Sequence, residues 1–151
     1  MEALLKTWKT SRKIYAGFFD QYTLEQLNTI PQGYSNNLIW NIGHIIVAQQ
    51  SLIYRLSGLP MLVTDELFNR YKPGSKPEAS VTQAEADELK QLLYSEVEQF
   101  ETDYAAGKFV SFTERMTATG FQLANLNDAL EFNNYHEGLH LGYMMGIRKF
   151  V

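Results

Sequence analysis

Helical periodicity over most of the chain determines what this sequence can fold into. Apolar residues recur at three- and four-residue spacing, and alternating patterns typical of strands are few. The pattern predicts four long helices, over about residues 2–22, 37–57, 82–104 and from residue 125 to the C-terminus. Four such helices with two long connections predict an all-α four-helix bundle. A length of 151 residues is typical of one domain, so we expect a single domain over residues 1–151.

Helix-start motifs and breakers predict the connections. Thr23 and Gln26 have the spacing of a capping box, so a short helix should follow the first long one. Thr82 and Glu85 repeat this spacing at the start of the third long helix. The connection between the third and fourth long helices is expected to contain a brief extended segment at residues 108–112.

The second long helix is followed by an unusually long crossover. Ser35 or Asn36 is expected to cap this helix, and Gly58 suits the position just after its end. Residues 59–80 then connect it to the third helix, with a short helix expected at residues 64–71. A crossover of this length allows the second and third helices to run in the same direction.

Charge and composition exclude several classes of function. The net charge is −4 and the pI about 5.4, and the lysines and arginines are scattered, so neither DNA nor RNA is an expected partner. The N-terminal segment resembles no signal peptide, and no stretch approaches the roughly 20 apolar residues of a membrane span. We therefore expect a cytoplasmic protein without membrane contact. The absence of cysteine restricts any metal site to His, Asp or Glu ligands.

The chain has three histidines, and their positions predict a metal site. His136 and His140 are one helical turn apart, so their side chains project from one face of the last long helix. His44 lies midway along the second long helix, and becomes a third ligand if the two helices are neighbours. The faces around these histidines carry mostly small or polar residues, which is typical of a cavity wall.

The segment "HEGLH", from His136 to His140, also matches the H-E-x-x-H pattern of zinc proteases. Such proteases generally take their third ligand downstream of the motif and use its glutamate as a general base. Only eleven residues follow His140, and none is His, Asp or Glu. No sheet is expected that would align a peptide substrate. The sequence therefore argues against a protease.

Two segments, "NNLIWNIGHI" and "YHEGLHLGYMMGIRK", resemble the DinB/YfiT-like superfamily of small helical metal proteins. The resemblance spans nearly the whole chain. It implies an up-down-down-up bundle, a divalent metal bound by the positions matched by His44, His136 and His140, and a homodimer. Characterised members include metal-dependent thiol S-transferases and isomerases that use low-molecular-weight thiols.

Three imidazoles leave a bound metal at least one open position, which is typical of a catalytic site. Zinc or nickel suits these ligands best. With a small-molecule substrate and a thiol cosubstrate, the expected activity is a low-molecular-weight-thiol S-transferase. A metal-dependent hydrolase and a non-catalytic metal-binding or interaction module remain the alternatives.

Four further residues are candidates for supporting roles. Asn41 and Asn133 lie about one turn from the histidines and could orient them or bind substrate. The alternative is that both are ordinary amides on the helix surface. Glu137 and Tyr143 are candidate catalytic residues. The alternatives are a solvated or salt-bridged carboxylate for Glu137 and a core aromatic for Tyr143.

Overall fold

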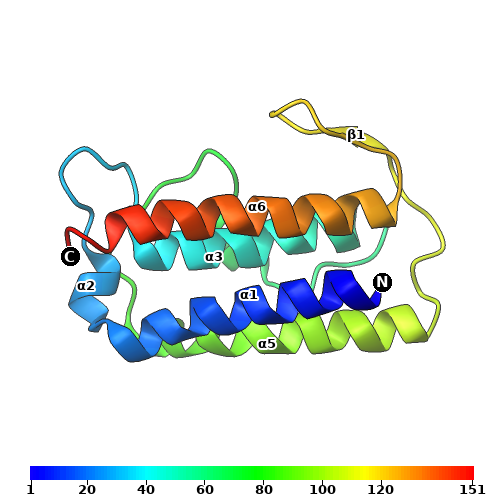
Figure 1. Cartoon of the computed structure of the whole chain (residues 1–151). Helices are drawn as coiled ribbons and strands as arrows, with labels where there is room; N and C mark the ends of the chain where they lie inside the picture. The colour runs from blue at the N-terminus through cyan, green and yellow to red at the C-terminus, as the bar shows by residue number, and fades with distance from the viewer.

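The structure is a computed structural model that describes all 151 residues. Its elements, shown in Figure 1, are α1 (Glu2–Gln21), α2 (Leu24–Asn28), α3 (Leu38–Gln49), the π-helix η1 (Gln50–Arg55), α4 (Asp65–Tyr71), α5 (Gln83–Ala105), β1 (Arg115–Met116), β2 (Gln122–Leu123) and α6 (Leu126–Ile147).

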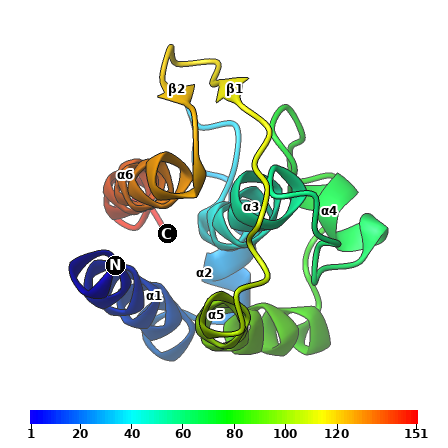
Figure 2. The same cartoon turned by 90° about the vertical axis from the view of Figure 1, so that its right-hand side faces the viewer.

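The long helices form the predicted four-helix bundle. Viewed end-on, α1 contacts α5 and α6, and α3 contacts the same two helices from the opposite side of the bundle (Figure 2). The helices α1 and α6 run in one direction, and α3 and α5 run in the other (Figure 1). The up-down-down-up order is therefore confirmed. No helix is both long and apolar enough to cross a membrane.

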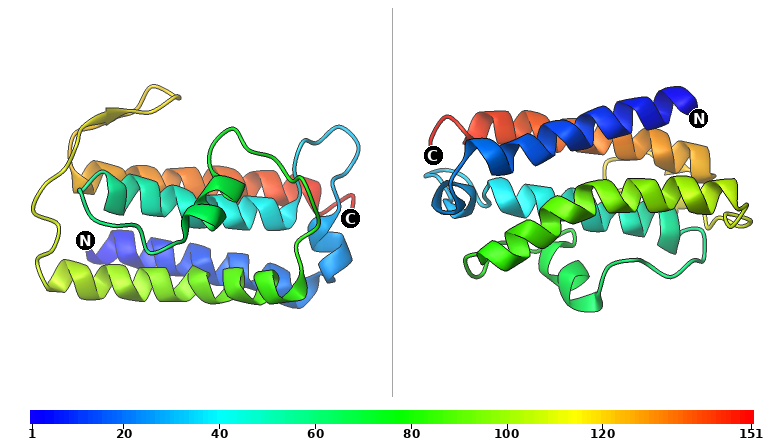
Figure 3. Two further views of the ribbon diagram at one scale, coloured as in Figure 1. Left: turned by 180° about the vertical axis from the view of Figure 1, so that it is seen from behind. Right: turned by 90° about the horizontal axis from the view of Figure 1, so that it is seen from below.

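The crossover between α3 and α5 covers the outer side of α3. Seen from behind and from below, it carries α4 across the bundle surface (Figure 3). All twelve residues of α3 are consequently buried, because α4, α5 and α6 pack around it. The expected crossover and its short helix are confirmed, and their position makes α3 the central helix of the molecule.

The helix starts follow the expected chemistry with two differences. The capping box of Thr23 and Gln26 forms in full. Asn37 caps α3 by accepting from Trp40 N at 2.9 Å, so the expectation of a cap one or two residues earlier was wrong. Thr82 caps α5, but the reciprocal bond is absent because the Glu85 carboxylate is bound elsewhere.

The second long helix is not α-helical throughout. Its last six residues form the π-helix η1, and Gly58 follows with a φ of +72°. A π-helix contains an extra residue per turn, so the side chains after it are rotated relative to a continuous α-helix. The periodicity of the sequence predicts the helix but not this change of register.

The extended segment lies later in the chain than expected. Residues 108–112 form no strand, and the only two strands are β1 and β2, which pair as a short antiparallel hairpin. Gly120, with a φ of +88°, closes its turn. Phe121 packs against Phe132 and Tyr135 of α6, with ring centroids 5.2 and 5.0 Å apart. This contact anchors the hairpin to α6.

Glu96 of α5 is an acidic side chain inside the bundle. It is 2% exposed, and neither carboxylate oxygen has a hydrogen-bond partner. Burial disfavours the ionised form and raises the pKa of Glu96 to about 8. Glu96 is therefore protonated in the folded protein at neutral pH.

This protonation predicts a pH dependence of stability. The unfolded chain releases the Glu96 proton near pH 4.5 and the folded chain near pH 8, so stability should fall as the pH rises between these values. The slope due to Glu96 is at most about 1.4 kcal/mol per pH unit. We expect Glu96→Gln to remove this slope in urea unfolding between pH 6.5 and 8.5. The exposed control Glu98→Gln should keep the slope. Parallel plots of unfolding free energy against pH for wild type and Glu96→Gln would contradict the assignment.

Candidate metal centre

The three histidines meet between α3 and α6. One ring nitrogen from each of His44, His136 and His140 lies within 4.8 Å of the others. The His140 ring centroid is 4.6 Å from each of the other two, which are 5.2 Å from one another. The helices are adjacent and antiparallel, as the predicted site required. No carboxylate belongs to the cluster.

His44 is oriented by the crossover. Its Nδ1 lies 2.7 Å from the main-chain oxygen of Tyr71, at the end of α4. A carbonyl only accepts hydrogen bonds, so Nδ1 carries the proton and Nε2 keeps the free lone pair. Gly43 makes this approach possible, because a Cβ there would lie 2.5 Å from the Tyr71 ring. The Trp40 ring, stacked on His44 at 4.9 Å, fixes the plane of the imidazole.

His140 is oriented by a side chain from α3. Its Nδ1 donates to Asn41 Oδ1 at 2.8 Å. The Asn41 amide nitrogen in turn donates to Asn37 O and Asn36 Oδ1, which fixes the orientation of the amide group. The lone pair of His140 is therefore also on Nε2. Hydrogen bonds of this kind, made by the ring nitrogen that does not bind the metal, orient histidine ligands in metal sites.

His136 has no such restraint. Its ring packs against Phe132 one turn earlier, with centroids 5.9 Å apart. Its Nδ1 is buried without a hydrogen-bond partner in the protein. This ring can therefore present either nitrogen to a ligand, and it is the adaptable member of the three.

Electrostatics keep the cluster in the form that binds cations. Burial, together with a smaller effect of the neighbouring imidazoles, lowers the pKa of His136 to about 4 and that of His140 to about 3. Burial also lowers the pKa of His44. All three rings are neutral at pH 7, as metal ligation requires.

The donor set fits a divalent ion. Nitrogens bound to tetrahedral zinc at 2.0–2.1 Å lie about 3.4 Å apart, so the histidine rings need only small shifts to bind one. Two tautomers are already set, and the third nitrogen is unpaired. The cluster can thus hold a metal ion with three protein ligands.

A cavity of about 260 Å³ adjoins the cluster. His44 and His136 form part of its wall, and Ala48, Ser51 and Leu52 extend that wall along α3 and η1. The hairpin closes another side. Sequence reasoning predicted the small and polar face of α3 but missed the hairpin, whose sequence carries no metal-site motif.

Residues 7–144 match the family model of the DinB superfamily. The chain belongs to the DinB superfamily. The expected family is thus confirmed, and the match includes all three histidines. No curated protein matches this DinB-superfamily chain.

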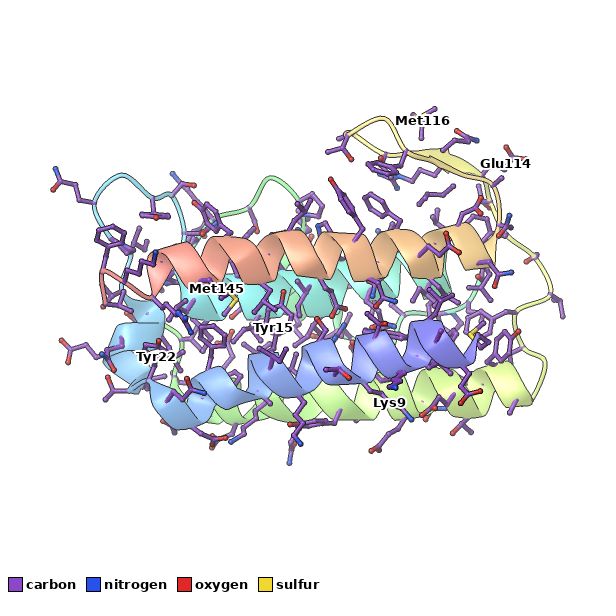
Figure 4. All side chains as sticks on the ribbon, in the orientation of Figure 1. Lys9, Tyr15, Tyr22, Glu114, Met116 and Met145 are labelled. Carbon is purple, nitrogen blue, oxygen red and sulfur yellow. The ribbon has the colours of Figure 1, made fainter.

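Glu137, the glutamate of the protease-like motif, points away from the three histidines of this DinB-superfamily protein. It is fully buried against α1 and accepts hydrogen bonds from Trp8, Arg12 and Asn133 at 2.9–3.2 Å. Tyr15 of α1, whose side chain lies between α1 and α6, donates to the main-chain oxygen of Glu137 (Figure 4). The structure therefore places Glu137 in an ion pair with Arg12, outside the site where a candidate catalytic residue was expected.

The other predicted residues divide between two locations. Asn133 donates to Glu137, and so belongs to the network on the α1 side. Tyr143 is 39% exposed and packs edge-on against Tyr34 at 5.5 Å. With Asn41 and His140 it lines a separate hollow of about 280 Å³. Of the four supporting candidates, only Asn41 makes a hydrogen bond to a histidine.

Metal analysis tests the cluster. We expect about one equivalent of divalent metal in the untagged wild-type protein. His44→Ala and His136→Ala remove ligands from different helices, and both should lose the metal. Elemental analysis and chelator competition measure this, with the exposed Glu131→Ala on α6 as the matched control. A wild-type protein that refuses added zinc and nickel would disprove the site.

Substitution of Glu137 should affect folding rather than metal binding. Glu137→Gln leaves the Arg12 charge buried without its counterion, and loss of one partner from such a pair costs about 3–5 kcal/mol. We expect a large drop in urea-unfolding free energy and unchanged metal content in the folded fraction. Metal loss at full stability would instead place Glu137 in the metal site.

Proposed function

We propose that this DinB-superfamily protein is a divalent-metal-dependent enzyme that transfers a low-molecular-weight thiol to a small electrophilic substrate. The observation that carries the proposal is the convergence of three neutral imidazoles beside a cavity of about 260 Å³. Zinc or nickel is the proposed metal, bound by His44, His136 and His140. The bound ion would supply a positive charge and an open position that lower the pKa of a thiol.

The composition of the cavity favours a thiol over water as the nucleophile. No Asp or Glu lines the cavity, so no carboxylate is in place as the base that hydrolysis generally uses. A thiol, with an ordinary pKa near 8.5, needs far less help to ionise than water does. The chain contains no cysteine, so the sulfur must come from a cosubstrate.

The protein's own side chains would position the reactants. The bonds to Tyr71 O and Asn41 hold His44 and His140 in the tautomer whose Nε2 is free. Leu52, Leu56 and Phe132 provide an apolar wall that excludes water from the reacting groups. In the proposed step the thiol proton leaves to solvent, and the thiolate sulfur forms a bond to the electrophilic carbon. The bond from that carbon to its leaving group breaks at the same time, and the leaving group departs with the bonding electron pair.

We further propose that residues 1–151 form one domain and that the protein is a homodimer. The exposed Tyr135, Leu139 and Tyr143, spaced four residues apart on α6, support the dimer because they give this helix an apolar outer stripe.

Turnover by the metal-loaded protein tests the proposed function. We expect product formation from a panel of alkylating electrophiles to require an added thiol. His140→Ala should reduce the rate at least about 100-fold, and Glu131→Ala should leave it unchanged. Turnover without thiol would support a metal-dependent hydrolase instead. Metal binding without turnover under any condition would support a non-catalytic module.

A further inference from the structure

The hairpin of β1 and β2 forms one side of the cavity beside the histidines. Figures 1 and 2 show it projecting from the bundle next to the start of α6. Arg115 and the turn residues Thr117, Ala118 and Thr119 line the cavity. Any molecule that reaches His44 and His136 through this cavity therefore contacts the hairpin as well.

The pairing of the strands identifies the inward face of the hairpin. Arg115 pairs with Leu123, and cross-strand partners project from the same face. Leu123 is 1% exposed, so this face is directed toward the bundle. Met116 alternates to the outer face, is 58% exposed, and lies on the side away from the helices (Figure 4). Arg115 is itself solvent-exposed, and it shares this face with the buried Leu123.

Arg115 has no partner in the protein. It is the only charged side chain lining the cavity, and it makes neither an ion pair nor a side-chain hydrogen bond. The nearest acidic residue in sequence, Glu114, accepts instead from Gln122 Nε2 at 3.1 Å. A guanidinium carries five donors, so Arg115 retains its full capacity for a ligand.

We propose that Arg115, assisted by the one hydroxyl proton that the hydrogen bond between Thr117 and Thr119 leaves free, is a carboxylate-binding subsite of the cavity. This inference rests on the proposed function only in requiring that the cavity admits a small molecule. A molecule held there would carry its carboxylate at the hairpin and its reactive group at the histidine cluster. Arg115 would then act as a specificity-determining residue that selects acids over neutral compounds of the same size.

The surroundings favour a carboxylate over a phosphate. A single guanidinium binds a carboxylate through two parallel hydrogen bonds and matches its one negative charge. Phosphate sites generally add a helix N-terminus or several main-chain amides, and no helix start lines this cavity. The volume of about 260 Å³ suits a small organic acid.

Binding of a carboxylate that lacks a thiol tests the subsite separately from catalysis. We expect succinate to shift the backbone amide NMR signals of residues 115–119 saturably, in both metal-free and zinc-loaded protein. Arg115→Ala should weaken binding at least about tenfold, and Arg115→Lys should restore only part of it, because an ammonium lacks the bidentate geometry. Arg148→Ala, which removes an exposed arginine at the end of α6, is the matched control.

Three outcomes would overturn the subsite: no saturable shift, equal binding by Arg115→Ala, or tighter binding of inorganic phosphate than of succinate. A second comparison uses cobalt-substituted protein, in which thiol binding produces a near-ultraviolet charge-transfer band. We expect 3-mercaptopropionate to bind about tenfold more tightly than 1-propanethiol, and Arg115→Ala to abolish the difference. Succinate binding without any thiol band would contradict the proposed thiol chemistry and leave the carboxylate subsite standing.

Discussion

The buried contact between Glu137 and α1 determines how the rest of the structure is arranged around the three histidines. Arg12 and Trp8 hold the carboxylate on the α1 side of α6, and Asn133 adds a bond from within the same helix. Because successive residues of a helix are about 100° apart, this contact fixes the rotation of α6 about its axis. His136 and His140 are then directed toward α3. The glutamate that suggested a protease thus stabilises the packing of α6 on α1, and the histidines beside it lie on the other side of the helix.

The three histidines are restrained to different degrees. His44 and His140 each have one ring nitrogen tied to a neighbouring element, whereas His136 has none. A site with two oriented ligands and one adaptable ligand can close around ions of different size and geometry. This asymmetry agrees with a cluster whose donor set alone does not distinguish zinc from nickel.

The sequence predicts those parts of the molecule that depend on periodicity and on spacing within one helix. The four long helices, the crossover with α4 and the pairing of His136 with His140 are of this kind. The remaining features depend on contacts between segments distant in the chain. The Tyr71 carbonyl reaches His44 across 27 residues, and Glu137 meets Arg12 across 125. Arg115 could not be assigned to the cavity because its position depends on the anchoring of a two-residue strand.

The π-helix separates the two tasks that one long helix performs. Residues before it hold His44 and the packing of the bundle, and residues within and after it, Ser51, Leu52 and Leu56, line the cavity. Conversion of η1 to a regular α-helix of the same length would turn the side chains that follow it and leave His44 where it is. The π-helix is therefore a position at which the direction of the cavity-lining side chains can change while the three histidines stay in place.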